Sequence, residues 1–491
     1  MAPMLTPAVA ALLEALKRAL AARDRAATNR AVEQILAHEA SLGMQWRQLA
    51  ELMRVSGELT LALRCMDRFV SAAGGTAQAQ YAKVVLLTQS SRIPEAYALL
   101  AALPESVPEL AGHAYVLGNI AMTLGETEKA RAHLETALTH RPGWGPAWLT
   151  LATMIDFGKD ALRDRLLAEA SIAERQGPGD LARFCYALGK AHADSGEAED
   201  AFKAYARGAE LLRGETPYSR EGNARNAGEA MTGYPPGFFE RLAKPADHDT
   251  SRPIFVTGLP RSGTTLVEQI LTSHSAVRDG AEINIIQHIA VAAGGVSGDA
   301  LGKYLATGGS IDTLAGLYLH LLEERFGPGG RIVDKTIDAS RYIGLIAAAL
   351  PDAPLIWMRR DPLDSAWSCF RTFFIHGVAW SYRLEDIAHH FRLEDRLMAF
   401  WKERLGDRLL VVPYADLVDA PEAWTRRILD HCGLEEEEAV FTPHKTERLV
   451  ATASSLQVRR PINRDGLGVA DPYRPFMQPF VDAYEDGEPA R

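Results

Sequence analysis

Cysteines and long apolar runs are both scarce in this chain. Its 491 residues include only Cys65, Cys185, Cys369 and Cys432, and none belongs to a Cys-x-x-Cys pair. This spacing argues against a structural zinc site and fits a reducing compartment. No apolar stretch reaches the roughly 18–20 residues of a membrane span, and the first residues have the spacing of an amphipathic helix instead of a secretory signal. We therefore expect a cytoplasmic protein that uses no metal.

Positive charge is also in short supply. The 53 Lys and Arg residues stand against 63 Asp and Glu residues, which gives a formal net charge of -10. This balance argues against a general nucleic-acid binder, although it leaves room for a local basic pocket. A length of 491 residues exceeds what one hydrophobic core supports, so two or more domains are expected.

Small residues recur at a fixed spacing in the first 214 residues. One set of equivalent positions, separated by 34, 34, 34 and 37 residues, is Ala50, Val84, Gly118, Ala152 and Gly189. A second set is Ala62, Ala96, Ala130 and Ala201, and glycines that fit the turn between two helices are Gly57, Gly125 and Gly196. The pattern resembles tetratricopeptide repeats, with a weak fourth copy in which Asp164 replaces the expected alanine.

Residues 1–214 are thus predicted to form an all-α solenoid of stacked helix pairs. Its concave groove would bind a peptide or a partner protein. The alternative is that the repeats only brace the second domain or form a homodimer contact. No membrane or nucleic-acid partner is expected.

Residues 215–252 are rich in glycine and proline and read as a linker. From residue 253 to 491 apolar strands alternate with helical patterns, which predicts an α/β domain with a parallel sheet. The predicted strands are 254–258, 331–335, 355–359 and 409–413, and the predicted helices are 264–273, 338–350, 363–374 and 421–432. Arg261, Lys335, Arg360 and Tyr414 each follow one of these strands or close it. Because ligands bind at the carboxyl ends of such strands, these side chains are expected to converge.

The segment from Gly258 to Thr265 has the form of a phosphate-binding loop between a strand and a helix. Its spacing, Gly258-x-x-x-x-Gly263, is that of a nucleoside-triphosphate loop, but Thr264 stands where the lysine is expected. Arg261 supplies the positive charge instead. The loop therefore favours a single 5′-phosphate over a triphosphate and argues against a P-loop kinase.

Three motifs in this order resemble those of sulfotransferases. They are Pro260-Arg-Ser-Gly-Thr-Thr265, Arg360 followed by Ser368, and Tyr414-x-Asp416-Leu-Val. With the repeats in front, the chain is similar to bacterial tetratricopeptide sulfotransferases related to the protein-tyrosine sulfotransferases. The resemblance implies a P-loop-like domain that uses 3′-phosphoadenosine 5′-phosphosulfate (PAPS) as its donor, without a metal.

The resemblance also assigns the donor contacts. The 5′-phosphate would lie on the loop formed by Arg261, Ser262, Gly263, Thr264 and Thr265. The 3′-phosphate would contact Arg360 and Ser368, and Tyr414 would lie near the adenine. Other readings are a salt bridge of Arg360 with Asp361 or Asp364, and a purely structural Tyr414.

Catalytic roles follow from the same resemblance. Lys335 matches the lysine that contacts the bridging oxygen, and Glu282 matches the general base, although Ala281 replaces the glutamate that precedes the base in the family. The alternative for Glu282 is a surface glutamate at the start of a helix. His274 and His288 are fallback bases.

The C-terminal segment supplies two more matches. Ser454 corresponds to a serine that contacts the phosphosulfate and Arg460 to a basic residue that contacts the adenosine phosphate, with Arg459 as the competing candidate. Residues 464–474 are expected to cover the donor.

The sequence therefore predicts a PAPS-dependent transferase that acts on a hydroxyl, with peptide or protein tyrosine as the favoured acceptor. Asn284 replaces an arginine that helps the relatives bind acidic peptides. A small-molecule or saccharide acceptor with purely structural repeats is the alternative. A non-catalytic repeat scaffold is the third hypothesis.

Overall fold

The computed structural model of the protein describes residues 6–38, 42–242, 245–280, 282–336, 338–374, 378–446 and 460–485. The chain divides into two compact units. Unit 1 contains residues 1–140 and 320–327, and unit 2 contains residues 141–319 and 328–491. The domain boundary predicted at residue 214 marks the end of the repeat pattern and stays a prediction.

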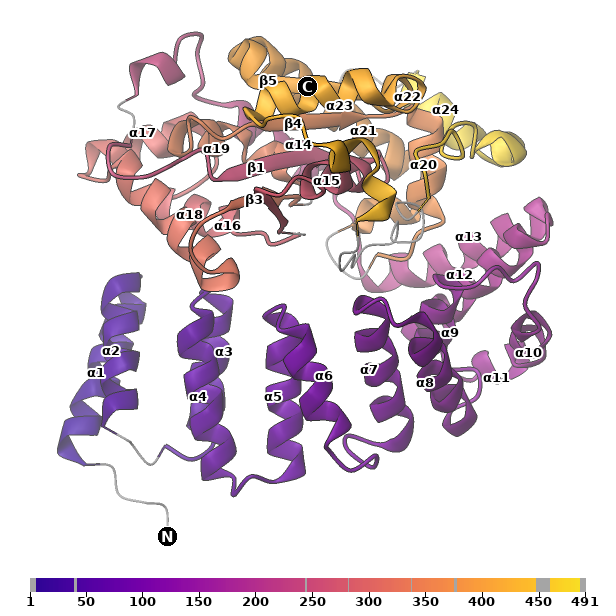
Figure 1. The fold of residues 1–491 in the computed structure, drawn as a ribbon, viewed down its shortest axis with the longest axis horizontal. Helices are drawn as coiled ribbons and strands as arrows, with labels where there is room; N and C mark the ends of the chain where they lie inside the picture. Colours follow the sequence, from indigo (N-terminus) through magenta and orange to yellow (C-terminus); the bar gives the residue numbers. More distant parts are fainter. Residues whose placement is uncertain are drawn as a thin grey trace. The chain divides into compact units, whose positions relative to one another are not determined.

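Unit 1 is a row of helix pairs (Figure 1). Its helices are α1 (Pro7–Ala21), α2 (Arg25–Ala37), α3 (Gln45–Val55), α4 (Leu59–Ala72), α5 (Ala77–Gln89), α6 (Ile93–Ala101), α7 (Leu110–Thr123) and α8 (Thr127–His140). The two helices of a pair cross closely at small residues, since Ala50 and Ala62 are fully buried. A Cβ on Gly118 would lie only 2.8 Å from Leu134 Cγ. The row is consistent with the predicted solenoid, and its tetratricopeptide nature stays a prediction.

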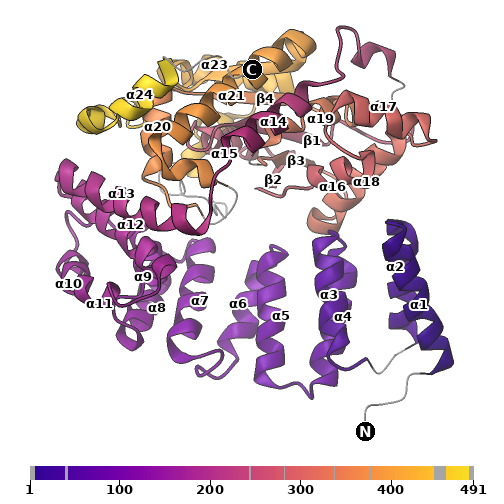
Figure 2. The ribbon, with the colours of Figure 1, turned by 180° about the vertical axis from the view of Figure 1, so that it is seen from behind.

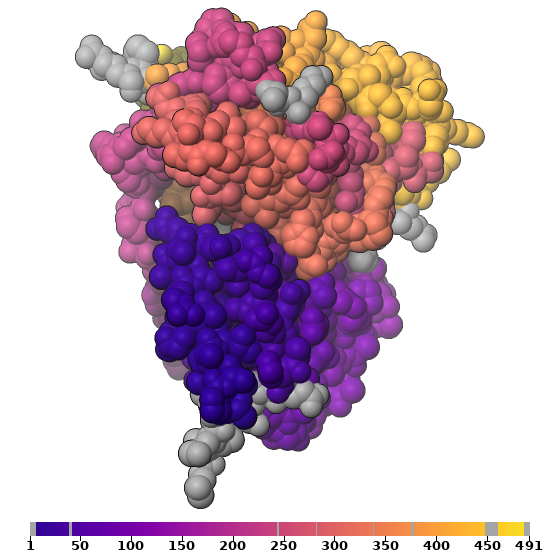
Figure 3. All heavy atoms as spheres, turned by 90° about the vertical axis from the view of Figure 1, so that its left-hand side faces the viewer, coloured from indigo at the N-terminus to yellow at the C-terminus, as the bar shows by residue number. Residues whose placement is uncertain are grey.

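The turn between α3 and α4 also follows from the sequence. Gly57 adopts a φ of +82° between α3 and α4, a conformation that only glycine adopts without strain. The first helix pair ends the row and faces the viewer in Figure 3. Its exposed side chains include Glu14, Lys17 and Arg30.

Unit 2 begins with helices that continue the chain after the row. They are α9 (Gly145–Ala152), α10 (Leu162–Ala168), α11 (Ala170–Ala173), α12 (Pro178–Asp194), α13 (Ala198–Glu215) and α14 (Arg220–Met231). The weak fourth repeat is visible here, because two short helices, α10 and α11, stand where the second helix of the pair is expected. The pair α12–α13 shares its core with the α/β part of the unit, where Tyr205 packs edge-on against Trp367 at 5.7 Å between ring centres.

The α/β part contains a parallel sheet in the order β2-β3-β1-β4-β5 (Figure 2). The strands are β1 (Pro253–Gly258), β2 (Val277–Asp279), β3 (Arg331–Asp334), β4 (Leu355–Arg359) and β5 (Leu409–Pro413). The parallel sheet and the four predicted strands are confirmed, and β2 is an addition. On one face of the sheet, alternate strand residues such as Val256 and Ile356 pack against apolar residues of the helices that follow β1 and β5. On the opposite side Phe255 packs against Tyr318.

The helices of the α/β part connect or follow these strands. They are α15 (Thr264–Thr272), α16 (Ile286–Ala293), α17 (Gly298–Ala306), α18 (Ile311–Phe326), α19 (Ile343–Ala349), α20 (Pro362–Phe370), α21 (Leu384–Leu405), α22 (Tyr414–Asp419), α23 (Pro421–Cys432) and α24 (Gln478–Glu485). Among the described helices, none has the length and apolar character required to cross a membrane.

Candidate functional site

The loop between β1 and α15 is shaped by residues with unusual backbone angles. Gly258 has a φ of +142° and Gly263 a φ of +104°. A Cβ on Gly263 would lie 2.5 Å from Tyr414 Cδ2, so only glycine fits there. Arg261 adopts a φ of +68°, which costs energy for a residue with a side chain. The loop therefore holds a fixed, strained shape immediately before the N-terminus of α15, where an anion is stabilised.

A pocket of about 240 Å³ opens beside this loop. Four arginines line it, Arg261, Arg360, Arg371 and Arg460, together with Ser368 and Tyr414. Arg261 and Arg360 come from the ends of neighbouring parallel strands, and Arg371 follows the C-terminus of α20. Of the four side chains predicted to converge, Arg261, Arg360 and Tyr414 line this pocket, whereas Lys335 does not.

The guanidinium groups of this pocket are held away from water and near one another. Burial, together with the nearby charge of Arg371, lowers the pKa of Arg261 to about 10. Burial also lowers the pKa of Arg360, although Asp364 counteracts part of the shift. Three cations that destabilise one another in this way favour the arrival of a multiply charged anion.

Arg360 is oriented by neutral groups. Its Nη1 donates a hydrogen bond of 2.8 Å to the carbonyl oxygen of Arg261, and its Nη2 donates to the carbonyl oxygen of Gly466. The guanidinium carbon lies 5.3 Å from the ring centre of Tyr414. The two carboxylates considered as salt-bridge partners have other tasks, because Asp361 caps α20 and Asp364 accepts hydrogen bonds from a nearby loop.

Two buried polar atoms of residues that line the pocket have no hydrogen-bond partner, the hydroxyl group of Ser368 and the Nε of Arg360. The buried hydroxyl group of Ser262, in the β1–α15 loop, also has none. Buried polar atoms are nearly always hydrogen-bonded in proteins, so atoms left without a partner point to a ligand. Ser368 lies two turns into α20, as its spacing from Arg360 predicted, and its side chain reaches the pocket.

A loop of residues 460–470 forms the outer wall of the pocket. Asp364 fixes this loop, because its two oxygens accept hydrogen bonds from the backbone of Gly468 at 2.8 Å and of Ala470 at 3.0 Å. Arg460 lines the pocket with an exposed side chain. Ser454 and Arg459 lie outside the described residues.

The second part of the site surrounds Lys335, directly after β3. The side chain of Lys335 is 4% exposed, and its Nζ lies 3.0 Å from Glu282 Oε1. Neighbouring Asp334 anchors the strand end, since it accepts hydrogen bonds from Tyr318 and from the backbone and hydroxyl group of Thr336. The Thr336 hydroxyl oxygen in turn accepts a hydrogen bond of 3.1 Å from the backbone of Asn284. This chain of contacts brings the Glu282 loop to Lys335.

The two fallback bases differ in position. His274 is engaged through both ring nitrogens, because Nε2 contacts the carbonyl oxygen of Glu435 at 3.0 Å and Nδ1 accepts from the backbone of Ala276 at 3.0 Å. It does not offer a base to an acceptor. His288 is half-buried on α16.

Arg371 and Glu268 belong to the site's surroundings but escaped the sequence interpretation. Arg371 lies three residues after Ser368, a spacing that puts both on one face of a helix, and this signal was available. Glu268 lies one turn into α15, where it looks like an ordinary polar helix position. Its Oε2 is 3.8 Å from Lys335 Nζ.

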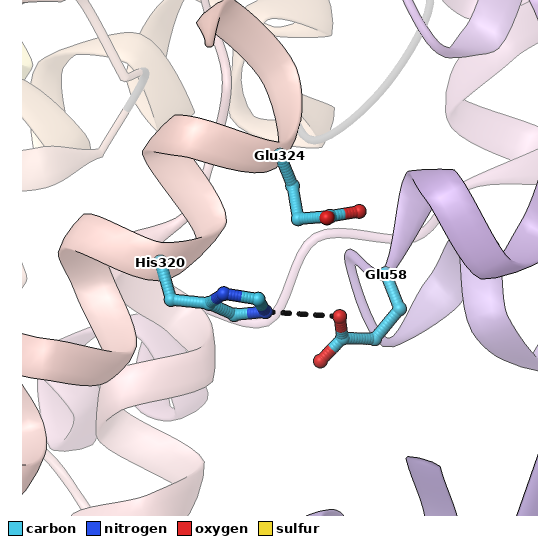
Figure 4. A group of neighbouring side chains, drawn as sticks. All are labelled: Glu58, His320 and Glu324. Carbon is cyan, nitrogen blue, oxygen red and sulfur yellow. Dashed lines mark hydrogen bonds and ion pairs between the residues drawn. The ribbon is translucent and has the colours of Figure 1, made fainter. Parts of the chain in front are cut away.

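Groups of side chains with metal-ligand chemistry occur elsewhere. Among the described residues they are Glu58 with His320 and Glu324, His192 with Glu197 and Asp200, and Asp338 with His390 and Glu394. In the first group, shown in Figure 4, His320 and Glu58 form a hydrogen bond of 3.0 Å. Arg25 donates to the same carboxylate of Glu58, so protein cations already compensate it.

Comparison with known proteins agrees with this geometry. Residues 253–438 match the model of the Sulfotransferase family. An uncharacterized protein of Aquifex aeolicus is 27% identical over 424 residues, which cover 82% of this chain and 54% of that protein. Protein-tyrosine sulfotransferase 1 of Danio rerio is 26% identical over 46% of this chain and 68% of its own length. The protein-tyrosine sulfotransferase of Drosophila melanogaster is 25% identical over 44% of this chain and 46% of its own length. The chain thus spans about half the length of the Aquifex and Drosophila relatives.

Solved sulfotransferase structures are also similar at low identity. The sulfotransferase domain of the Synechococcus PCC 7002 olefin synthase is 20% identical, with a TM-score of 0.35, over 50% of this chain and 98% of that domain. Mouse sulfotransferase SULT7A1, solved in complex with PAP, is 14% identical, with a TM-score of 0.30, over 54% of this chain and 94% of the mouse protein.

Proposed function

We propose that the protein transfers a sulfuryl group from PAPS to a hydroxyl acceptor. The observation that carries this proposal is the pocket lined by four arginines, in which the buried hydroxyl group of Ser368 and the Nε of Arg360 lack partners. Arginine forks and hydroxyl donors are the groups that bind phosphate oxygens most strongly. PAPS carries phosphate at two positions, and the pocket offers contacts at two ends, the β1–α15 loop and the Arg360–Ser368 side. The sulfotransferase family match of residues 253–438 supports the same donor.

The roles of the residues follow from their positions. Arg261 and the loop of Ser262 to Thr265 bind the 5′-phosphate. Arg360, Ser368 and Arg371 bind the 3′-phosphate, and Tyr414 packs beside the adenosine. Arg460 contacts the donor from the outer wall of the pocket, and Ser454 is proposed to assist at the phosphosulfate.

Transfer itself uses the second part of the site. Glu282 removes the proton of the acceptor hydroxyl as the acceptor oxygen forms a bond to sulfur. The bond between sulfur and the bridging oxygen breaks, and its electron pair goes to the 5′-phosphate. Lys335 stabilises this developing negative charge, which is the largest contribution such sites make to transfer. General-base assistance contributes on the order of 10²–10⁴-fold.

The favoured acceptor is a tyrosine of a peptide or protein. Two relatives of 25–26% identity are named protein-tyrosine sulfotransferases. The helix row of unit 1 would present such an acceptor. Asn284, with a φ of +52°, stands where the resemblance to protein-tyrosine sulfotransferases implies an arginine, which favours an acceptor with fewer acidic neighbours. Transfer to a small phenol or a saccharide, with purely structural repeats, is the alternative.

Calorimetry with 3′-phosphoadenosine 5′-phosphate (PAP) tests the donor site. We expect Arg360→Ala to weaken PAP binding by about a hundredfold, because a charge-assisted contact to phosphate is lost. Arg359→Ala is the matched control, since the neighbouring arginine pairs with Asp395 instead of lining the pocket. Wild-type protein that gives no heat with PAP would favour a non-catalytic scaffold.

Transfer of labelled sulfate to peptide, phenol and polysaccharide pools then identifies the acceptor. Glu282→Gln should keep PAP binding and lose turnover. An unchanged rate in this variant would remove Glu282 from the role of base.

A further inference from the structure

Glu268 is a buried carboxylate beside the transfer site that the mechanism above does not use. Its side chain is 1% exposed, and its Oε2 lies 3.8 Å from Lys335 Nζ. Glu268 belongs to α15, the helix whose N-terminus follows the phosphate-binding loop, and it lies one turn after Thr264. One rigid helix therefore carries both the loop that holds the donor and a carboxylate that faces the lysine.

A buried ammonium group needs a permanent counter-charge. Lys335 is 4% exposed, and an isolated ammonium is expensive to keep away from water. Two carboxylates supply this charge, but they differ in setting. Glu282 lies on the loop before α16, and 40% of its side chain is exposed. Glu268 belongs to helix α15, and its side chain is buried.

The difference matters when the proton moves. In the proposed reaction Glu282 takes the acceptor's proton and becomes neutral, so Lys335 loses its nearest counter-charge at that moment. Glu268 takes no part in this proton transfer. A carboxylate on a helix also holds its partner more accurately than one on a loop.

We propose that Glu268 is a positioning residue that holds the Lys335 ammonium group against the bridging oxygen while Glu282 changes its charge. This inference rests on the proposed sulfuryl transfer. Glu268 does not touch donor or acceptor in this account, and it acts through Lys335 alone.

Steady-state kinetics tests the claim. We expect Glu268→Gln to lower kcat by about 10- to 100-fold, because a misplaced catalytic group costs that much, while the affinity for PAP stays unchanged. Glu268→Asp should recover part of the rate, since it restores the charge. Glu169→Gln is the control, because Glu169 is a buried carboxylate of unit 2 that binds Trp148 Nε1 at 2.8 Å, far along the sequence from the site. Glu169→Gln should lower the thermal stability of the protein and leave kcat unchanged.

A double-mutant cycle separates a positioning role from a structural one. In a Lys335→Met background, Glu268→Gln should have no further effect on the residual rate, because its target is gone. Equal losses of rate in both backgrounds would overturn the proposal.

Thermal stability gives an answer that does not depend on activity. Lys335→Met leaves Glu268 as a buried carboxylate without the lysine, so adding Glu268→Gln should raise the melting temperature of that variant. The same substitution in the wild type should lower it. A decrease in melting temperature in both backgrounds would show that Glu268 serves another partner. If the wild-type protein transferred no sulfuryl group, the proposed function would be refuted, but the melting temperatures would still test the contact between Glu268 and Lys335.

Discussion

Arg341 and Arg261 lie in the same unit and are both mostly withdrawn from water, yet their pKa values shift in opposite directions. Burial would lower the pKa of Arg341, but Glu394 and Asp338 outweigh it and raise the value. Arg341 Nη1 lies 2.6 Å from Glu394 Oε1, and Nη2 donates to Asn223 at 2.9 Å. For Arg261, burial and the charge of Arg371 both lower the pKa.

The contrast separates a structural cation from a binding cation. Around Arg341 the protein supplies the negative charge itself, so the interaction contributes to folding. Around Arg261, burial and the charges of Arg371 and Arg360 act in the same direction, so a bound anion would be favoured there. This argument does not depend on any resemblance to other proteins.

The prediction with the largest expected effect compares the stability contributions of Arg341 and Arg261 directly. Arg341→Met should destabilise the protein by about 3–5 kcal/mol, because it leaves the buried carboxylate of Glu394 without its partner. Arg261→Met should change stability by no more than about 1 kcal/mol, since it removes an unfavourable cation and keeps the same backbone angles. Urea denaturation measures both. Equal losses of stability would mean that Arg261 is also a structural residue.

The second prediction sharpens the comparison through two glycines with positive φ. Gly263→Ala would place a Cβ 2.5 Å from Tyr414, so we expect PAP binding to weaken by about tenfold or more through displacement of the ring and the loop. Gly294→Ala, at a φ of +79° with nothing within 4 Å, should cost only about 1 kcal/mol of stability. Calorimetry and thermal melts distinguish the two. PAP affinity that survives Gly263→Ala would contradict the assigned loop.

The third prediction concerns the wall of the pocket. Asp364→Asn replaces one of the two oxygens that hold Gly468 and Ala470 with an NH₂ group, which cannot accept a hydrogen bond. We expect faster PAP dissociation and about fivefold weaker binding, a loss of about 1 kcal/mol. Stopped-flow displacement measures the rate, and Asp482→Asn on exposed α24 is the control. An unchanged dissociation rate would show that the wall does not retain the nucleotide.

The sequence was sufficient for the features that depend on local pattern. Apolar runs predicted β1, β3, β4 and β5, and the recurrence of small residues predicted the close helix pairs of unit 1. Strand β2 escaped because its three residues, Val277–Asp279, are too short to show alternation. In the fourth repeat two short helices, α10 and α11, replace one helix. No local pattern at Asp164 specifies this break.

Strand ends and motif spacing made part of the site predictable. Arg261, Lys335 and Arg360 follow strands, so the topology brings them to one edge. Arg371 and Glu268 reach the site from within or after a helix, where function depends on which face turns toward the sheet. That orientation is a property of tertiary packing, and the sequence around Glu268 resembles any amphipathic helix. Ser454 stays a prediction.

The smallest expected effect concerns the ion pair between His320 and Glu58 in unit 1. Like Arg341, His320 is paired with a carboxylate, but its side chain is half exposed. The hydrogen bond with Glu58 raises the pKa of His320. Burial would raise the pKa of Glu58, but His320, Arg25 and Asn29 lower it to about 2, so Glu58 stays charged at neutral pH. Because the folded-state pKa of His320 lies above its unfolded value, its stabilisation is complete below the unfolded value and disappears as pH rises through the folded one.

Thermal melts between about pH 5.5 and 8.5 measure this dependence, a window that spans the usual histidine pKa. Since 48% of the His320 side chain is exposed, solvent screening limits the effect to a few tenths of a kcal/mol. The difference in melting temperature between wild type and His320→Gln should therefore be greatest at the acidic end and vanish at the alkaline end. A difference that is constant with pH would mean that His320 contributes through packing and not through its charge.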